Sequence, residues 1–262
     1  MARHDSEQRP RSLRQALREQ RTLLGTFVME LPVRATVEAV ARAGLDFVVV
    51  DQEHAPTSLG EVQHLIACAR AERLHVVVRS RAGDLSSLTA ILDMRPDGLM
   101  IPGIASAEAA RAVVAAARYH PLGSRGVAPL IRHEGAFASV DEALALIVQI
   151  ESADAVGAVS EIAAIPGIDC IFVGPYDLSQ SLGAVADVNA PAVREAAAGI
   201  AARASETVAV GAHMPNAAVL RDWAGLGFGF LTYRTDGQLL EAGCAVAAAD
   251  VAAAFGGGNP SV

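Results

Sequence analysis

Eight short apolar runs recur along this chain, and each is followed by a segment with helical character. The runs are almost continuously apolar, as expected for parallel strands that are buried on both faces. They fall at residues 25–30, 46–51, 75–79, 97–102, 145–151, 168–174, 207–213 and 227–233. Eight strand–helix units in 262 residues predict an α/β fold, the (β/α)8 TIM barrel. A doubly wound open sheet is the alternative, but no GxGxxG motif follows the first run, which also argues against a nicotinamide cofactor.

The pattern divides the chain into one large domain and two short ends. The barrel is expected to occupy residues 21–255. Residues 1–20 are charged and rich in arginine, which predicts a loose arm or a helix that caps the bottom of the barrel. Residues 256–262 read GGGNPSV and predict a flexible tail.

The chain contains no lysine, because all 21 of its basic residues are arginines. Enzymes that bind pyridoxal phosphate or form a Schiff base need a lysine amine, so this sequence excludes both. Arginine cannot replace lysine there, since its guanidinium stays protonated. Carbanion chemistry on this chain would therefore need a metal ion as the electron sink.

Composition narrows the partners and the compartment. The net charge of −8 argues against nucleic-acid binding. The three cysteines are widely spaced and predict reduced thiols rather than disulfides. The N-terminus lacks a secretory pattern, and no apolar run reaches the length of a membrane span, about 18 residues. We therefore expect a cytoplasmic protein without a membrane partner.

Charged side chains stand where several of the predicted strands end. Asp51 and His54 follow the second run, Arg79 ends the third, Glu151 ends the fifth and Asp177 follows the sixth. The carboxyl ends of barrel strands share one face, so these side chains are expected to lie together. Charges at the ends of buried strands are costly unless they are paired or bind something. The pattern therefore indicates a metal-dependent active site.

Each of these residues has a chemical and a structural interpretation. Glu151 and Asp177 match the oxygen ligands that Mg²⁺ or Mn²⁺ prefers, or they cap the helices that follow. His54 suits a general base, or it is structural. Arg79 would bind a carboxylate or stabilise an enolate oxygen, or it forms a salt bridge across the barrel mouth. Asp51 would orient His54 or hold a metal-bound water.

Other polar residues carry weaker signals. Arg125, in the GSRGV stretch of a long loop, would bind an anion or brace the loop. Glu53 fits a structural ion pair as well as it fits catalysis. The remaining histidines lack metal-ligand spacing, so they are interpreted as surface or packing residues, with His133 the exception because of its loop.

Five segments together resemble one enzyme family. They are GLDFVVVDQEHAP, HVVVRS, HPLGSRGV, VQIES and IFVGPYDLSQSLG, and the similarity runs in order from about residue 22 to 250. The family is the HpcH/HpaI aldolases, metal-dependent class II pyruvate aldolases related to 4-hydroxy-2-oxoheptanedioate aldolase. The resemblance implies a (β/α)8 barrel, often a hexamer with an exchanged C-terminal helix.

The resemblance also implies roles for particular residues. It implies a divalent ion held by Glu151 and Asp177, His54 as a base acting through water with Asp51, and Arg79 at the enolate. It further places Gln149 near the substrate.

The sequence departs from the family pattern at three places. Gln52 stands where relatives often have glycine, and Tyr176 stands beside Asp177 where relatives often have a small side chain. The stretch between Arg125 and Gln149 is shorter than in typical members. We therefore expect an altered pocket for the second substrate, with Tyr176 contributing to it.

These observations predict a carbon–carbon lyase. The expected reaction is cleavage or formation of a 4-hydroxy-2-oxo acid through a pyruvate-type enolate, with Mg²⁺, Mn²⁺ or Co²⁺ as cofactor and a 2-oxo acid and an aldehyde as small-molecule partners. Decarboxylation of a 2-oxo diacid such as oxaloacetate is an alternative on the same site. A non-catalytic barrel that serves as a binding or assembly subunit is a third interpretation.

Overall fold

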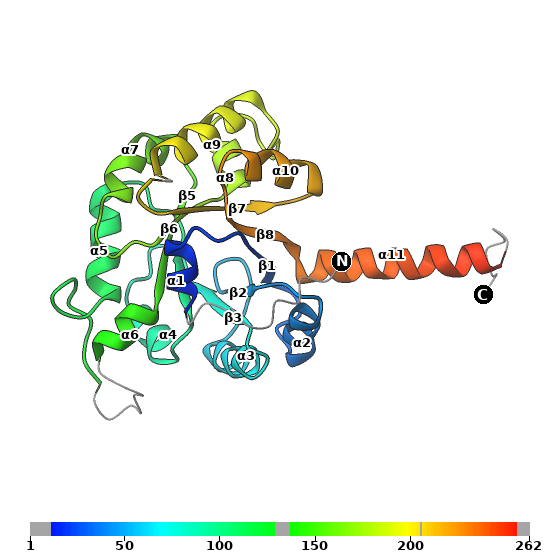
Figure 1. Cartoon of the computed structure of the whole chain (residues 1–262), viewed down its shortest axis with the longest axis horizontal. Helices are drawn as coiled ribbons and strands as arrows, with labels where there is room; N and C mark the ends of the chain where they lie inside the picture. Colours follow the sequence, from blue (N-terminus) through cyan, green and yellow to red (C-terminus); the bar gives the residue numbers. More distant parts are fainter. Residues whose placement is uncertain (1–11, 129–136, 205, 256–262) are drawn as a thin grey trace.

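The structure is a computed structural model, and it describes residues 12–128, 137–204 and 206–255. Eight parallel strands close into a barrel in sequence order, and helices surround it (Figure 1). The predicted TIM barrel is therefore confirmed. The strands are β1 Leu23–Val28, β2 Phe47–Asp51, β3 His75–Arg79, β4 Gly98–Ile101, β5 Ala145–Ile150, β6 Cys170–Val173, β7 Ala209–Met214 and β8 Phe230–Thr235.

The eight predicted helices appear between or after these strands. Of three further helices, the first lies in the segment where a loose arm or a capping helix was expected, and the other two were not predicted. The predicted helices are α2 Arg34–Arg42, α3 Leu59–Ala71, α4 Leu88–Asp93, α5 Ala107–Ala117, α7 Ala153–Ala163, α9 Pro191–Ala204, α10 Ala217–Gly225 and α11 Asp236–Ala254. The additional helices are α1 Leu13–Arg18, α6 Phe137–Ala143 and α8 Pro175–Ser181. Part of the long loop that was predicted after residue 119, including His133, lies outside the described residues.

Helix α8 covers the PYDLSQS segment that follows β6. Gly174 precedes the helix with extended backbone, and Pro175 takes the first helical position. Proline is well suited to that position, because its fixed φ matches the helix and the N–H that it lacks would have no partner inside the helix. Asp177 is thereby placed in the first turn of α8.

Alternation along the strands separates two apolar layers. Residues such as Phe47, Val49 and Ile147 point into the barrel, whereas their neighbours Val48 and Val50 pack beneath the outer helices. Side chains alternate between the two faces of a strand, so position along the strand decides which layer a residue joins. At Gly25, a Cβ atom would lie 2.6 Å from the Phe47 ring, so the missing side chain makes room for this aromatic residue.

Helix α1 lies across the amino-terminal end of the barrel. Its apolar residues Leu13, Ala16 and Leu17 are buried and join the cluster inside the barrel. Below them, Asp169 accepts hydrogen bonds from Arg14 Nε and Arg118 Nη2, both at 2.7 Å. All three of these charged side chains are buried, so the pairing compensates for their lost hydration.

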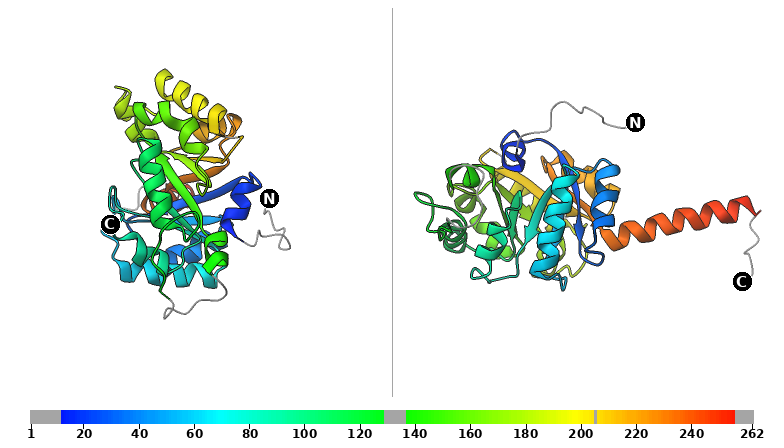
Figure 2. Two further views of the ribbon diagram at one scale, coloured as in Figure 1. Left: turned by 90° about the vertical axis from the view of Figure 1, so that its left-hand side faces the viewer. Right: turned by 90° about the horizontal axis from the view of Figure 1, so that it is seen from below.

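Helix α11 projects away from the barrel in Figure 1 and in the right-hand view of Figure 2. Its apolar residues Leu240, Val246 and Val251 are exposed, as is Phe255 directly after it. Within the described part of the chain, α11 is the one helix whose length and apolar composition would allow it to cross a membrane. Its single buried residue is Asp236, at the end that meets the barrel.

The buried network at Asp169 gives a prediction for stability. Asp169→Asn removes the charge that pairs Arg14 and Arg118, and breaking a buried pair costs roughly 3–5 kcal/mol. We expect the free energy of unfolding in urea to fall by about this amount. The matched control is Asp222→Asn, because Asp222 forms an exposed pair with Arg194, 3.4 Å apart. Exposed pairs contribute at most about 1 kcal/mol, so equal losses in the two variants would contradict the assigned role of the network.

Candidate active site

A cavity of about 390 Å³ opens at the carboxyl ends of the strands. Catalytic groups gather at this face in TIM barrels. Most of the predicted site residues line the cavity, together with residues that were not singled out. The lining consists of Phe27, Met29, His54, Arg79, Gln149, Glu151, Phe172, Gly174, Pro175, Tyr176, Asp177, His213, Thr235 and Gln238.

The Asp51 carboxylate lies beneath this cavity and is completely buried. Its two oxygens accept hydrogen bonds from Arg79 Nε at 2.7 Å and from Arg79 Nη2 at 2.9 Å. They also accept the backbone N–H groups of Glu53 and His54. Asp51 therefore accepts a hydrogen bond from the backbone N–H of His54 and does not contact the His54 imidazole ring. The predicted orienting role would be exerted on the turn that carries His54 and on the guanidinium of Arg79.

Arg79 is held on three sides. Besides Asp51, its Nη1 lies 3.1 Å from Glu53 Oε2, and its guanidinium stacks over the Phe27 ring with the carbon 4.7 Å from the ring centroid. Planar bidentate pairing and stacking are properties of arginine that lysine does not share. The structure thus shows the ion pair across the barrel mouth, and it also places Arg79 at the cavity wall.

His54 and Glu53 occupy the turn after β2. The His54 side chain is 57% exposed, and its Nε2 lies 3.7 Å from Glu53 Oε2. Burial raises the pKa of Glu53 above its ordinary value, and the charge of Arg79 opposes that rise. His54 can therefore exchange protons with solvent while its ring remains at the cavity.

Glu151 directly follows β5 and is mostly buried. Its Oε2 accepts the backbone N–H of Gly103 at 2.8 Å, and its Oε1 accepts Gln149 Nε2 at 2.9 Å. Burial, with the nearby charges of Glu53 and Asp177 adding to it, raises the pKa of Glu151 to about 7. This carboxylate thus carries its negative charge in a place where that charge is costly.

Gly174 makes room for this carboxylate. A Cβ atom on Gly174 would lie 2.6 Å from Glu151 Oε1. The φ of Gly174 is −87°, which any residue can adopt, so the close approach and not the backbone requires glycine here.

Helix α8 brings two further predicted residues to the cavity. Asp177 is exposed in the first turn and lines the cavity. Tyr176 is 43% exposed and lies beside His213, with ring centroids 6.1 Å apart. Tyr176 is therefore part of the cavity wall.

His213 is a site residue that the sequence interpretation missed. It follows Ala209 and Gly211 at every second position of β7, which is the alternation of inward residues. Its Nδ1 lies 3.1 Å from the hydroxyl of the buried Thr232. Burial, aided by the charge of Arg79, lowers the pKa of His213 to about 4. His213 is therefore neutral at pH 7 and can offer the cavity a hydrogen-bonding nitrogen.

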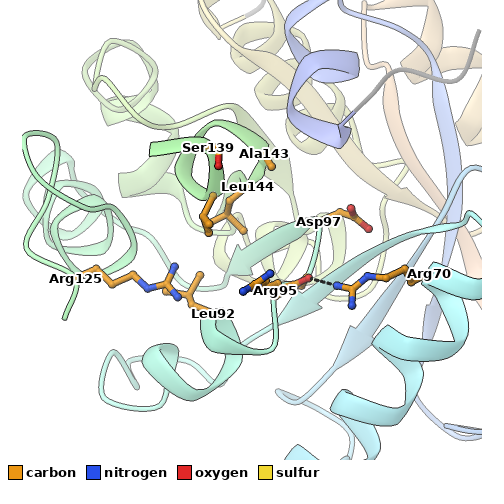
Figure 3. A pocket seen from close by; sticks show the side chains of 10 residues that line it. Arg70, Leu92, Arg95, Asp97, Arg125, Ser139, Ala143 and Leu144 are labelled. Carbon is orange, nitrogen blue, oxygen red and sulfur yellow. Dashed lines mark hydrogen bonds between the residues drawn. The ribbon is translucent and has the colours of Figure 1, made fainter. Parts of the chain in front are cut away.

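Arg125 does not join this site. Its Nη2 donates to Asp93 at 2.7 Å, and its guanidinium lies over the Tyr119 ring. It lines another cavity, with residues that precede β4 and β5 (Figure 3). The predicted contact of Arg125 with substrate is therefore not supported. Arg125 follows helix α5, and chain that leaves a helix in this fold returns to the amino-terminal face.

The charges around the main cavity favour a cation. Asp51, Glu53, Glu151 and Asp177 bring carboxylates to this end of the barrel, and Arg79 supplies one guanidinium. Within the described residues, no group of three or more acidic, histidine or cysteine side chains forms a complete metal site. Glu151 and Asp177 could hold a metal only as a partial ligand set.

A scan against protein families matches residues 27–240 to the HpcH/HpaI aldolase/citrate lyase family model. The chain belongs to this family. The HpcH/HpaI enzymes most similar in sequence include named aldolases, which are carbon–carbon lyases, and this chain is an enzyme of that class.

Three relatives of this HpcH/HpaI chain illustrate the match. A 2-dehydro-3,6-dideoxy-6-sulfogluconate aldolase of Pseudomonas putida is 34% identical over 184 residues, which cover 68% of this chain and 72% of the relative. A 2-keto-3-deoxy-L-rhamnonate aldolase of Escherichia coli O1:K1 is 37% identical over 153 residues, which cover 56% of this chain and 57% of the relative. A family structure from Burkholderia cenocepacia J2315 aligns with a TM-score of 0.85 at 33% identity, covering 91% of this chain and 98% of that one.

The raised pKa of Glu151 predicts how stability depends on pH. The pKa is about 7 in the folded chain and 4.5 ordinarily. The folded state therefore holds this proton more tightly, and the stability from this group is present below pH 4.5 and lost as the pH rises through about 7. We expect the melting temperature of the chelator-treated parent protein to fall as the pH rises over this interval. The melting temperature of Glu151→Gln should fall less.

The difference between parent and variant should amount to roughly 2–4 °C for each kcal/mol of penalty removed. Glu161→Gln, an exposed change on α7, is the control and should follow the parent. Parallel curves for parent and Glu151→Gln would show that the Glu151 charge carries no such penalty.

Proposed function

We propose that this enzyme is a divalent-metal-dependent aldolase that cleaves or forms a 4-hydroxy-2-oxo acid through a pyruvate-type enolate. The observation that carries the proposal is that Glu151, Asp177 and Arg79 line one cavity in a chain without lysine. An imine cannot form there, so a cation is the remaining means of stabilising a carbanion. Both similar aldolases are named for 2-oxo acids with a deoxygenated third carbon, and such acids release a pyruvate unit when they are cleaved.

The residues fit Mg²⁺, Mn²⁺ or Co²⁺. Two carboxylates with water and substrate oxygens would complete the coordination that such ions prefer. Gly174 leaves the space beside Glu151 Oε1 that a side chain would fill. When bound, the cation would hold the oxygens of the 2-oxo acid and share the negative charge of the enolate.

Arg79 would stabilise the oxygen that becomes negative in the reaction. Its guanidinium is already fixed by Asp51 and stacked on Phe27, so little reorganisation is needed when the charge develops. Gln149 would position the substrate, because its side chain reaches the cavity and its buried Oε1 has no hydrogen-bond partner in the structure. His54 would take the proton of the 4-hydroxyl group through a water molecule, because a histidine that lines the cavity can serve as a general base.

Tyr176 and His213 would form the part of the cavity that receives the aldehyde. Their ring centroids lie 6.1 Å apart, and both residues line the cavity. If the Thr232 hydroxyl donates to His213 Nδ1, then His213 Nε2 carries the proton and donates into the cavity. Such a donor favours an aldehyde with an oxygen substituent near its reacting carbon.

Helix α11 supports assembly into a homo-oligomer, which the resemblance extends to a hexamer. The helix is long, apolar and uncovered by its own barrel. A helix that is apolar around its circumference is stable when another surface covers it. A second copy of the chain would supply that surface, and we propose a cytoplasmic oligomer.

Metal dependence is the first prediction of this proposal. Exhaustive chelation should abolish aldol cleavage, and Mg²⁺, Mn²⁺ or Co²⁺ should restore it. Gly174→Ala should weaken metal binding by roughly tenfold or more, since its Cβ would displace the Glu151 carboxylate. Metal affinity measured by calorimetry checks this, with Gly157→Ala as control because that position is open. Full activity without bound metal would refute the proposed function.

His54 gives a prediction that is separable from metal binding. His54→Ala should keep the metal and slow aldol cleavage by roughly 10²–10⁴-fold, the usual contribution of a positioned acid–base group. His64→Ala, an exposed histidine on α3, is the matched control and should keep the parent rate. Near-normal turnover of His54→Ala at pH 7 would remove this residue from the mechanism.

Tyr176 gives a prediction about the second substrate. Tyr176→Ala should change the order of kcat/KM values across a series of aldehydes, because removal of the ring widens the cavity on that side. His213→Phe keeps a ring in place but removes the nitrogen, so it should selectively disfavour hydroxylated aldehydes. A uniform change for every aldehyde would indicate a loss of stability or packing and not a change of the pocket.

A further inference from the structure

A second cavity, of about 220 Å³, lies at the opposite end of the barrel from the candidate active site. Its walls come from the end of α3, the segment between α4 and β4, the loop after α5, and α6 with the start of β5. Arg70, Arg95 and Arg125 extend toward it from three of these segments (Figure 3). This gathering of arginines is unusual on a chain whose net charge is −8.

Several guanidinium nitrogens at this cavity are buried without a partner. Arg125 is 6% exposed, and although its Nη2 is bonded to Asp93, its Nε and Nη1 have no hydrogen-bond partner in the structure. Arg95 Nη2 is also buried and unpartnered. Buried donors that lack an acceptor cost about 1–3 kcal/mol each, so an acceptor in the cavity would relieve a penalty that the fold carries.

The backbone brings Arg95 to this position at a further cost. Its φ is +57°, a left-handed conformation that arginine seldom adopts. The carbonyl of Arg95 accepts a hydrogen bond from Arg70 Nη2 at 3.1 Å, which holds the two arginine segments together. The guanidinium of Arg125 points toward that of Arg95 across the cavity (Figure 3).

The carboxylates nearby do not use up this positive charge. Asp93 takes one nitrogen of Arg125. Asp97 lines the cavity, but its Oδ2 accepts the backbone N–H of Val76 and lies 3.7 Å from His75 Nδ1. Counting Arg70, Arg95 and Arg125 against these two carboxylates leaves a positive excess.

We propose that this cavity binds a small phosphate monoester at a site separate from the active site. Guanidinium groups match phosphate oxygens with paired hydrogen bonds, and Arg95 and Arg125 both line this cavity. Val140, Ala143 and Leu144 of the α6 wall are apolar. A short carbon chain would therefore contact α6 while the phosphate meets the arginines.

Calorimetric titration of the full-length, Mg²⁺-loaded enzyme tests the proposal. Glycerol 3-phosphate is the probe, inorganic phosphate shows whether the carbon chain contributes, and malonate shows whether a dicarboxylate substitutes. Ionic strength is held constant with chloride, because exposed charges are screened by salt. We expect one glycerol 3-phosphate per chain, bound more tightly than phosphate or malonate.

Two variants and two controls assign the binding to this cavity. Arg95→Asn removes the guanidinium and suits a left-handed φ, and it should weaken binding by roughly tenfold or more, the loss of one charge-assisted contact. Arg125→Gln should act in the same direction. Arg73→Asn is the matched control, since Arg73 has φ +56° on the same face but lines only a neighbouring cleft. It should change the affinity by less than roughly twofold.

Glu151→Gln distinguishes this site from the active site. It should leave glycerol 3-phosphate binding unchanged, even where it abolishes aldol cleavage. The proposal is overturned if no saturable binding occurs at millimolar concentrations, if Arg73→Asn weakens binding as much as Arg95→Asn does, or if Glu151→Gln removes it. A failure of Arg125→Gln to fold leaves the decision to Arg95→Asn.

Discussion

The ion pair between Asp51 and Arg79 organises the mouth of this barrel. Asp51 is completely buried, and its oxygens are filled by Arg79 and by the turn after β2. Arg79 is the only arginine that lines the main cavity in the described chain, and two of its nitrogens are bonded to Asp51. The other carboxylates at the cavity therefore lack a full counter-charge. Burial, aided by the charges of Glu53 and Asp177, raises the pKa of Glu151 to about 7, and the charge of Arg79 opposes that rise only in part. The same pair that fixes Arg79 thus leaves the site with an unmet demand for positive charge.

Glu151 and Asp177, which create this demand for positive charge, are held by different kinds of secondary structure. Glu151 directly follows a strand of the closed sheet and is bonded to Gly103 and Gln149, whereas Asp177 is exposed on the first turn of a short helix. The tyrosine beside Asp177 shares that helix, so a shift of α8 would change the proposed cation site and the proposed aldehyde pocket together.

The fold and much of the site could be predicted because buried strands leave a direct record in the sequence. Apolar runs identified every strand, and the charged residues that follow them identified Arg79, Glu151 and Asp177 as lining one cavity. The sequence interpretation missed His213 because it considered only metal-ligand spacing. It did not consider that His213 alternates with Ala209 and Gly211 along β7. Arg125 was misplaced for the opposite reason: its motif was weighed, but its position after a helix, which directs it to the other face, was not. The unpaired nitrogens of Arg95 and Arg125 depend on long-range packing that the sequence does not reveal.

Helix α1 has a consequence for traffic through the enzyme. Leu13, Ala16 and Leu17 fill the amino-terminal opening, and Leu13 lies against Gly98 of β4. Helix α1 therefore closes the amino-terminal end of the barrel. A molecule that reaches the inner end of the cavity must enter through the cavity mouth at the carboxyl ends of the strands. Under the proposed aldolase function, both reactants would therefore enter and leave through the same mouth of the barrel.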